Sequence, residues 1–394
     1  MPPASDIAAP ISSIRPTVGR RRGGGHLSSG GCGIVSIFVP DRRILTTGGA
    51  GFIGSSLALE LADRHPAWEV VACDNLYRRG SELNLPRLRA GGVTFLHADV
   101  RQPADLERAG AFDALVECSA EPSVMASVQG DADYVVATNL VGAHHCLELA
   151  ARHGAQVVFL STSRVYPVAA LEGLAYTEGA KRFELAAQQP VAGASERGIA
   201  EDFPLDGART LYGASKLAAE LLVTEYAASH GLDTVVNRCG VVAGPWQMGK
   251  VDQGVFTHWM LSYLRGRPLS YFGYAGTGKQ VRDLLHVADL VALIEDQLLR
   301  PRHWCGCTFN VGGGLSGSLS LRETTAICQE LTGSTTEPGS DPQTRAGDVP
   351  VYISDCSALY AHTEWRPRRG PRETLEDICR WIRDHEDLVS AALA

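Results

Sequence analysis

Tyr212 and Lys216 are residues whose types and spacing could support catalysis. They lie four positions apart in a run rich in Ala and Leu. That run predicts a helix, on which residues four apart share one face. A phenol whose pKa is near ~10 is a poor base at neutral pH. A neighbouring ammonium stabilises the phenolate and lowers its pKa, which brings the tyrosine toward the range of a general base. The pair therefore predicts proton transfer with a substrate hydroxyl.

Another hydroxyl group precedes this pair. The apolar run at 156–161 leads directly into Thr162. This hydroxyl could orient a substrate and share the proton with Tyr212, and Lys216 could also hold the ribose of a nicotinamide. A tyrosine and a lysine on an exposed helix are common by themselves. The catalytic interpretation of Thr162, Tyr212 and Lys216 therefore depends on whether the chain also carries a nucleotide site.

A glycine-rich turn near residue 50 predicts such a site. A short apolar run ends in glycines at Gly48, Gly51 and Gly54, and a helix-forming run follows at once. The glycines let the backbone turn sharply and approach a pyrophosphate, whose charge then meets free N–H groups at the positive end of the helix. We also expect Phe52 and Ile53, which lie between the last two glycines, to contact the cofactor.

An acidic residue follows at the expected distance. Asp74 ends the second predicted strand, 20 residues beyond Gly54. A carboxylate at this point accepts hydrogen bonds from the adenosine ribose and repels a 2′-phosphate. The sequence therefore predicts NAD rather than NADP, with Asn75 as a further contact. Arg78 and Arg79 could soften this preference, but a solvated loop is the simpler interpretation of both.

We predict polar or cofactor-binding roles for three further residues. We place Asp99 and Val100, at the end of the third predicted strand, beside the cofactor. Asp99 could accept the adenine amino hydrogen, or it could cap the helix before Pro103, and both interpretations stay open. Asn139 falls inside a predicted helix, where it is neutral at best for helicity. We expect it to have a polar role in the interior, such as bracing the catalytic helix.

The elements that must position these residues alternate from residue 42 onward between short apolar strands and amphipathic helices. This alternation predicts an α/β fold, with parallel βαβ units in a doubly wound sheet of the Rossmann type. The expected strands are 43–47, 69–73, 93–97, 113–118, 156–161 and 233–238. The expected helices include 52–64, 102–109, 131–153 and 212–230.

Three segments are expected along the chain. Residues 1–40, rich in Pro, Ser, Gly and Arg, predict a disordered extension or a start codon placed too early. Residues 41–245 predict the NAD-binding domain, with an insert at 167–210 that we interpret as an active-site lid or flap. Residues 246–394 predict a smaller α/β domain that binds the substrate and returns segments to the sheet. The active site should lie in the cleft between the halves.

Composition limits the functional class. The 394 residues are 45% hydrophobic and 20% charged, as in ordinary globular proteins, and no apolar run reaches the length of a membrane span. The net charge of −8 argues against a nucleic-acid partner. Ten cysteines are too sparse for a disulfide scaffold, and Cys305 and Cys307 stand too close for the usual zinc spacing. We therefore expect a cytoplasmic protein without a metal, a membrane or a nucleic acid as partner.

The motifs together resemble a known family. The glycine turn at 47–54, the Asp74–Leu76 segment, the Ser161-Thr162 strand end and the Tyr212-x-x-x-Lys216 pair are similar to the extended short-chain dehydrogenases/reductases that act as nucleotide-sugar epimerases and dehydratases. The similarity runs from about residue 42 to the C-terminus. It implies bound NAD, a nucleotide-diphosphate sugar as substrate, and a homodimer or homotetramer.

Motifs in the second half agree with this resemblance. The stretch 278–287 resembles the family's Arg-Asp motif, whose arginine, here Arg282, contacts the nucleotide diphosphate. Arg345 and Asp348 resemble the segment that clamps the nucleotide, and Gln253 lies in a substrate-loop signature. A guanidinium suits a diphosphate because it is permanently charged and donates two parallel hydrogen bonds. We therefore expect substrate contacts at Thr162 and at these four residues.

Within the family, the likeness is greatest to enzymes that invert C2 of a CDP-hexose by transient oxidation to a keto sugar and hydride return. Two departures put the exact sugar in doubt, because Glu117 replaces the histidine usual after the fourth strand and Glu121 stands at a glutamine-like position. Dehydration is disfavoured, since Ser163 and Arg164 stand where dehydratases carry Asp-Glu, and arginine stays protonated.

Three alternatives remain within the same chemistry: a nucleotide-sugar 4-epimerase, a dehydratase and a decarboxylase. A fourth is a regulatory protein that binds NAD without catalysis. The presence of all three predicted catalytic side chains argues against that last alternative.

Overall fold

The computed structural model describes residues 40–123, 131–248, 254–345 and 347–392. The expected disordered extension therefore lies outside the described residues, apart from its last position. The predicted division between two domains at residue 245 stays a prediction.

The central element is a seven-stranded sheet whose neighbouring strands are all parallel. The strand order is β14-β10-β5-β4-β1-β2-β3, so the chain reverses its direction across the sheet between β1 and β4. This confirms the predicted doubly wound sheet. The strands are β1 (Arg42–Thr47), β2 (Trp68–Asp74), β3 (Thr94–His97), β4 (Ala114–Glu117), β5 (Gln156–Thr162), β10 (Thr234–Cys239) and β14 (Cys307–Val311).

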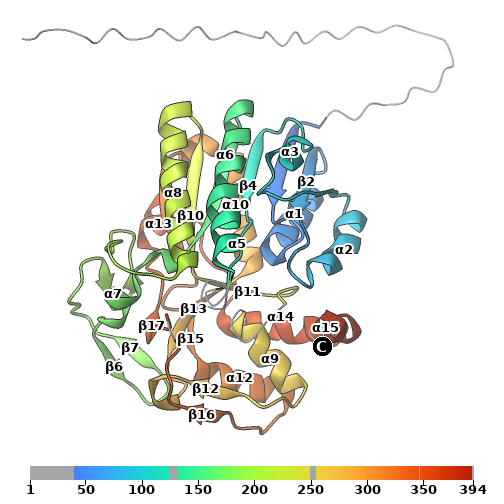
Figure 1. Cartoon of the computed structure of the whole chain (residues 1–394). Helices are drawn as coiled ribbons and strands as arrows, with labels where there is room; N and C mark the ends of the chain where they lie inside the picture. The colour runs from blue at the N-terminus through green and yellow to red at the C-terminus, as the bar shows by residue number, and fades with distance from the viewer. Residues whose placement is uncertain (1–39, 124–130, 249–253, 346, 393–394) are drawn as a thin grey trace, which may run out of the picture. The chain divides into compact units, whose positions relative to one another are not determined.

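Helices cover both faces of this sheet (Figure 1). Apolar residues of α3, α6 and α8 form one core with one face, and apolar residues of α1, α2 and α10 form a second core with the other. A parallel sheet needs this double cover because both of its faces are apolar. The helices are α1 (Phe52–Arg64), α2 (Leu85–Ala90), α3 (Pro103–Glu107), α5 (Ala132–Val136), α6 (Gly142–His153), α8 (Leu211–His230), α10 (Val287–Leu299), α11 (Pro301–Trp304) and α13 (Ser357–His362).

One predicted helix is interrupted. Instead of one helix over 131–153, α5 and α6 are separated by a π-helical turn, η2 (Ala137–Val141). Asn139 sits in this turn, and its side chain bonds to the backbone of Glu121 and to the side chain of Ser215. A side-chain amide that bonds to other elements explains why the regular helix gives way here. The predicted helix 102–109 is likewise shorter, because α3 ends at Glu107.

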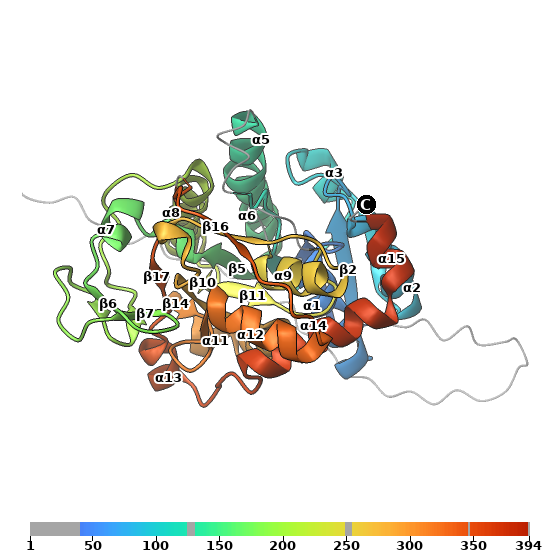
Figure 2. The same cartoon turned by 90° about the horizontal axis from the view of Figure 1, so that it is seen from below.

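A second layer lies below the carboxyl ends of the central strands in Figure 1 and faces the viewer in Figure 2. Its small sheet has the order β11-β13-β15, with β17 paired to β13. Three helices, α9, α12 and α14, pack together in a separate apolar core. The elements are β11 (Val241–Ala243), β12 (Ser270–Phe272), β13 (Val281–His286), β15 (Ser318–Ser320), β16 (Gly339–Asp341), β17 (Val351–Tyr352), α9 (Val255–Leu264), α12 (Leu321–Thr332), α14 (Pro371–Asp384), α15 (Glu386–Ala392) and the short η4 (Tyr274–Gly276).

The insert at 167–210 folds as a small packed unit. It contains α7 (Val168–Glu172), β6 (Tyr176–Glu178), β7 (Phe183–Leu185), β8 (Ala194–Ser195) and β9 (Gly198–Ile199). Its core includes Val349 and Tyr352, and the Ile199 N–H donates to the Ile353 carbonyl at 2.8 Å. The insert is thus tied to the second layer.

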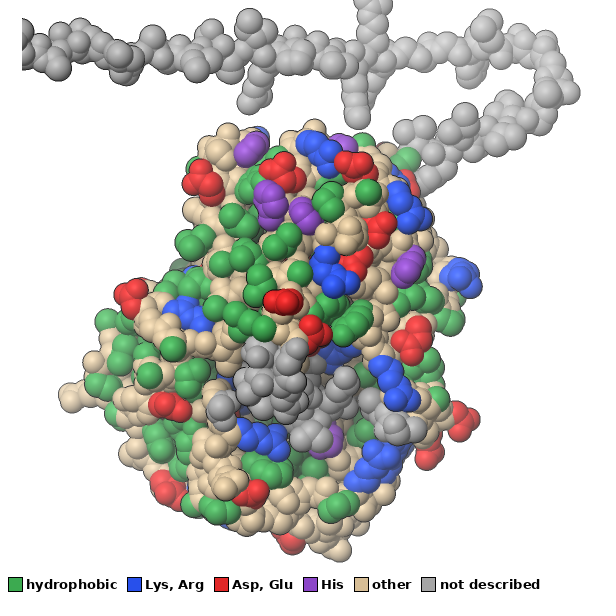
Figure 3. Space-filling view, in the orientation of Figure 1, with side chains coloured by type: hydrophobic (Ala, Val, Ile, Leu, Met, Phe, Trp, Pro, Cys, Tyr) green, Lys and Arg blue, Asp and Glu red, His purple; other side chains and the backbone are tan. Residues whose placement is uncertain are grey.

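Surface charge and helix length agree with the composition. Among the described residues on the face in Figure 3, acidic and basic side chains are interspersed. None of the helices in the described part of the chain is long and apolar enough to span a membrane.

Candidate active site

A cavity of about 880 Å³ opens at the carboxyl ends of β1, β2, β4 and β5. Its other wall comes from β11, from α9, and from Arg345, Gly347 and Asp348 of the second layer. Cavities at the point where strand order reverses are the usual ligand sites of such sheets. The cavity therefore lies where the predicted cleft was expected.

The glycine turn forms one wall of the cavity. Gly48 has φ +60°, and a Cβ there would lie 2.8 Å from the Cys118 carbonyl oxygen. A Cβ at Gly54 would clash with the carbonyl oxygen of Gly48, so both positions need glycine. The first turn of α1 has no acidic residue and its N-cap, Gly51, makes no side-chain bond. The positive end of α1 therefore faces the cavity, together with Phe52 and Ile53, and suits a pyrophosphate.

Asp74 lines the cavity and also fixes the turn. Its carboxylate accepts from the Ala50 N–H at 3.1 Å and from the Leu76 N–H at 2.8 Å. Burial raises the pKa of Asp74, and these backbone bonds oppose the rise. Asn75 lines the cavity beside it. The two residues are thus placed where an adenosine ribose was expected.

The Asp99 carboxylate is bound by neighbouring side chains and not by the start of a helix. Helix α3 is capped at Gln102 without a side-chain bond, so the predicted capping role of Asp99 is wrong. Its carboxylate instead binds the Arg101 guanidinium at 2.6 Å and the Asn75 amide at 3.1 Å. Burial would raise the pKa of Asp99, but these bonds outweigh it and lower the pKa to about 2. Val100 lines the cavity, whereas contact of Asp99 with adenine stays a prediction.

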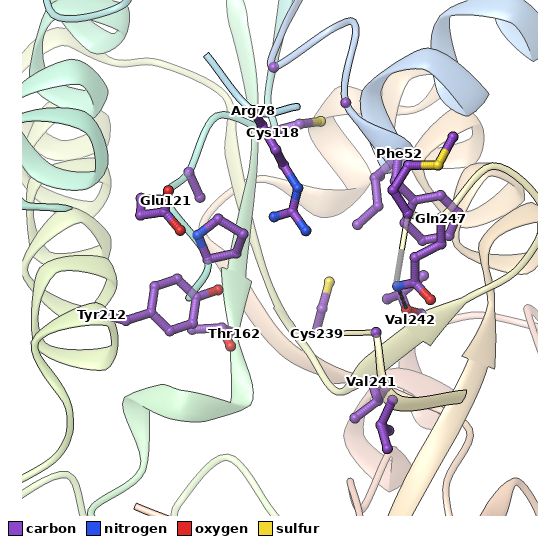
Figure 4. A pocket seen from close by; sticks show the side chains of 18 of the residues that line it. Phe52, Arg78, Cys118, Glu121, Thr162, Tyr212, Cys239, Val241, Val242 and Gln247 are labelled. Atoms are coloured by element: carbon purple, nitrogen blue, oxygen red, sulfur yellow. Dashed lines mark hydrogen bonds between the residues drawn. The ribbon is translucent and has the colours of Figure 1, made fainter. Parts of the chain in front are cut away.

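The loop after Asp74 differs from the solvated loop expected. Arg78 is half-buried, and its guanidinium points into the cavity (Figure 4). Arg79 also lines the cavity, but it is exposed and donates to the Ala391 carbonyl at 3.2 Å. The interpretation of Arg78 as a solvated residue is therefore wrong. Gly80, with φ +97°, turns the chain directly afterwards.

Thr162 and Tyr212 lie next to each other at the cavity (Figure 4), and Lys216 also lines it. Thr162 ends β5, and Tyr212 and Lys216 lie in the first two turns of α8. The Thr210 hydroxyl caps α8 by accepting from the Gly213 N–H at 3.3 Å. The Thr162 oxygen accepts from the Arg164 N–H at 3.2 Å, which leaves its own hydrogen to bond with the Tyr212 hydroxyl.

The charged groups near Tyr212 include a carboxylate that was not expected there, Glu117, which pairs with Lys216. The Lys216 ammonium lies 3.3 Å from the Glu117 carboxylate and 4.0 Å from the centre of the Phe159 ring. Burial raises the pKa of Tyr212, while the Thr162 hydrogen bond and the Arg164 charge oppose the rise. The pKa of Tyr212 is therefore raised in this structure because burial outweighs the nearby positive charge, while the influence of Lys216 on that pKa stays a prediction.

Asn139 braces the catalytic helix. Its amide donates to the Ser215 hydroxyl at 3.1 Å, and its carbonyl oxygen accepts from the Glu121 N–H at 2.8 Å. Ser215 stands between Tyr212 and Lys216 on α8. The predicted polar role of Asn139 is confirmed, and it fixes α8 against the end of β4.

The side of the cavity next to the 347–348 backbone is basic. Arg282 is paired with the Asp348 carboxylate, and the Arg345 guanidinium lies 4.1 Å from the centre of the Phe272 ring. Arg164 donates to the Gly347 carbonyl at 2.8 Å. The predicted substrate residues Arg282, Arg345 and Asp348 thus line one cavity. Gln253 lies outside the described residues.

Two cavity residues were missed as site residues. Arg164 was considered only as a residue that cannot serve as a base, and Glu121 only as a departure from the family pattern. Burial and the nearby Arg282 lower the pKa of Arg164. The sequence signal for Arg164 was its position two residues after the predicted catalytic Thr162. The direction of the Arg164 side chain could not be predicted, because it depends on the turn η3 (Ser163–Val165).

Comparisons with known proteins agree with this geometry. The model of the NAD dependent epimerase/dehydratase family matches residues 44–312. The CDP-paratose 2-epimerase of Salmonella typhi is 28% identical over 349 residues, which are 86% of this chain and 98% of that protein. A dTDP-glucose 4,6-dehydratase of Streptomyces antibioticus is 30% identical over 353 residues, 87% of this chain and 93% of that protein. The solved Thermus thermophilus UDP-glucose 4-epimerase in complex with NAD has a TM-score of 0.69 and 29% identity, covering 86% and 99% of the two chains.

Proposed function

This chain belongs to the NAD dependent epimerase/dehydratase family and is an NAD-dependent enzyme, and we propose that it inverts C2 of a CDP-hexose of the CDP-paratose or CDP-tyvelose type. The observation that carries the proposal is the joint placement of Thr162, Tyr212 and three arginines along one cavity. The likeness to CDP-paratose 2-epimerase supports the choice of base and carbon.

The glycine turn, the start of α1 and Asp74 would hold NAD along one wall of the cavity. Glycines that tolerate no Cβ, an uncapped helix start and a carboxylate beside the turn fit its pyrophosphate and adenosine ribose. When bound, NAD supplies reversible hydride acceptance at a sugar carbon. Lys216 would hold the second ribose.

The proton is transferred and stabilised by side chains of the protein. Tyr212 removes the proton of the hydroxyl on the reacting carbon and returns it after inversion. Thr162 donates to the phenolate oxygen and so stabilises the charged form of Tyr212. Arg164 adds positive charge on the same side without itself accepting a proton. No net oxidation or reduction of the sugar results.

The basic side of the cavity holds the nucleotide. Arg282 and Arg345 would bind the diphosphate, with Asp348 orienting Arg282. Anchoring the diphosphate while the glycosyl group turns allows both faces of C2 to be presented in the same site. We also retain Gln253 as a substrate contact, a homodimer or homotetramer as the assembly, and the cytoplasm as the location.

The test is incubation with CDP-paratose and CDP-tyvelose that carry deuterium at C2, with products followed by NMR. Epimerised product that keeps the label at C2 supports transient oxidation at that carbon. Loss of the label to water would replace this mechanism with proton abstraction. A stable 4-keto product would assign the chain to the dehydratases, and inversion at C4 of a UDP-sugar would assign it to the 4-epimerases.

A further inference from the structure

The loop after β2 has a backbone conformation that is unfavourable for its residue type. Leu76 has φ +55°, in the left-handed region that a residue with a Cβ rarely adopts. Side chains of the two preceding residues stabilise this turn. The Asp74 carboxylate accepts from the Leu76 N–H at 2.8 Å, and the Asn75 amide oxygen accepts from the N–H of Tyr77 at 3.0 Å. Strain of this kind persists where the surrounding structure fixes a particular geometry, and here it fixes the backbone at Tyr77.

Tyr77 packs against an aromatic side chain from another element. The ring centres of Tyr77 and Tyr134, which lies in α5, are 4.3 Å apart, and the angle between the ring planes is 30°. The Tyr77 hydroxyl also donates to the Asp131 carboxylate at 3.4 Å. Tyr77 and Asp131 are 54 positions apart in the sequence. The loop after β2 is thus joined to the start of α5 by a ring contact and a hydrogen bond.

A guanidinium group helps to fix the Tyr134 ring. The Arg101 Cζ lies over this ring, 4.6 Å from its centre. A cation is attracted to the face of an aromatic ring by the electrons of that face. Arg101 is itself held by the Asp99 carboxylate at 2.6 Å, and Asp99 accepts from the Asn75 amide at 3.1 Å. The Tyr134 ring therefore has a defined place, set by residues that follow β2 and β3.

The two tyrosines lie where the cavity is predicted to hold the adenosine of NAD. Tyr77 and Tyr134 both line the cavity, as do Asp74, Asn75 and Val100. The last three stand at or directly after the carboxyl ends of β2 and β3, where a sheet of this kind binds the adenosine half of a dinucleotide. The Tyr77 side chain is also 57% exposed, so its ring reaches from the cavity to the surface. The pair therefore bounds the outer side of the adenosine region.

We propose that Tyr77 and Tyr134 form an aromatic clasp, which closes over the adenosine half of NAD and keeps the cofactor bound throughout the reaction. This inference rests on the proposed function, in which a hydride leaves C2 of the sugar and returns to the same carbon. The cofactor must stay bound between these two transfers, because its release would leave an oxidised sugar behind. A clasp at the adenosine slows release without contacting the reacting carbon.

The test measures how fast the cofactor leaves the full-length protein, with NADH as the probe. Protein loaded with NADH is mixed with excess NAD, and the loss of bound NADH fluorescence gives the dissociation rate. Tyr77→Ala should raise this rate roughly fivefold, the size expected for the loss of one aromatic pair. Tyr77→Phe keeps the ring and should stay within about twofold of the wild type. The matched control is Tyr176→Ala, which removes a partly exposed tyrosine that packs against Phe183 in the insert, and it should leave the rate unchanged.

A double variant tests whether the two rings act as a pair. Tyr77→Ala combined with Tyr134→Ala should release NADH no faster than the faster of the two single variants, because either change alone opens the clasp. A double variant whose rate reflects the product of the two single effects would overturn the inference. An unchanged rate in Tyr77→Ala would also overturn it, and so would a Tyr77→Phe variant that releases NADH as fast as Tyr77→Ala. Tyr77 is an exposed loop residue, so its variants decide the outcome even if Tyr134→Ala does not fold.

The result is independent of the sugar. No sugar is present in this experiment, so failure of the clasp leaves the proposed epimerisation at C2 untouched. Failure of the deuterium experiment would in turn leave the measured dissociation rates as they are.

Discussion

The buried carboxyl group of Asp283 predicts how the free energy of unfolding depends on pH. The surroundings of Asp283 determine the size of this effect. This carboxylate lies in β13, fully buried, and accepts from the Ser354 N–H at 3.2 Å. Gly240 and Gly312 pack against its oxygens so closely that a Cβ at either glycine would clash with them. Burial raises the pKa of Asp283 to about 6, with hydrogen bonds from Ser354 opposing the rise. The folded protein therefore holds a proton at Asp283 more tightly than the unfolded chain does.

The sign and size of the pH dependence follow from the linkage between proton binding at Asp283 and folding. A carboxyl whose folded pKa is raised contributes stability that is complete below its unfolded pKa of 3.8 and is lost as the pH rises through about 6. A difference of about two pKa units corresponds to about 3 kcal/mol in full, of which about 2 kcal/mol falls between pH 4.5 and 7.5. Asp283→Asn removes the titration and keeps an oxygen that can accept from Ser354.

The assay is urea unfolding of the wild type and Asp283→Asn at several pH values, at one NAD concentration. The free energy of unfolding of the variant, minus that of the wild type, should rise by about 2 kcal/mol between pH 4.5 and 7.5. Any destabilisation by the amide that does not depend on pH cancels in this comparison. The contributions of all other titrating groups to the free energy of unfolding cancel as well. A difference that stays the same across the pH range would refute the reasoning.

Four further outcomes are expected at other positions. Tyr212→Phe should lose roughly 10²-fold or more in turnover while NAD stays bound, which single-turnover kinetics and cofactor release would check. Arg345→Gln should raise KM for the nucleotide sugar much more than it lowers kcat, and equal use of a free sugar would contradict that. Glu220→Gln should destabilise the fold by about 3 kcal/mol, measured by urea unfolding, because it leaves the buried Arg238 guanidinium without the carboxylate at 2.8 Å. Nucleotide released from denatured protein should be NAD rather than NADP if Asp74 selects the cofactor.

Local pattern was enough to predict the elements that hold the cofactor. The strand–glycine–helix unit was located to the residue for α1, because the turn glycines and the apolar face of 52–64 lie within one short stretch. For α8, the expected start differs by one residue from Leu211. The apolar faces of both helices depend on neighbours in sequence, and so does the Thr210 cap of α8.

Interactions between distant residues could not be predicted in this way. Asn139 was expected to be polar and interior, but the π turn around it depends on Glu121 and Ser215, which are 18 and 76 positions away. Arg78 looked like a solvated loop residue because nothing nearby in sequence shows that the loop faces a cavity. The pairing of Lys216 with Glu117 joins residues 99 positions apart. Burial of the Tyr212 side chain, which raises its pKa, likewise depends on segments distant in the sequence.

The distribution of charge in the cavity explains how one site could both anchor and invert a sugar. Near Tyr212, Lys216 is paired with Glu117, and Arg164 is a further positive charge. Beside the 347–348 backbone, Arg282 and Arg345 face one carboxylate, Asp348, and the excess is positive. Under the proposed function, we expect the diphosphate to bind at the second layer and the uncharged sugar to lie beside Tyr212. The orientation of the substrate would then depend on the two guanidinium groups that face a single carboxylate.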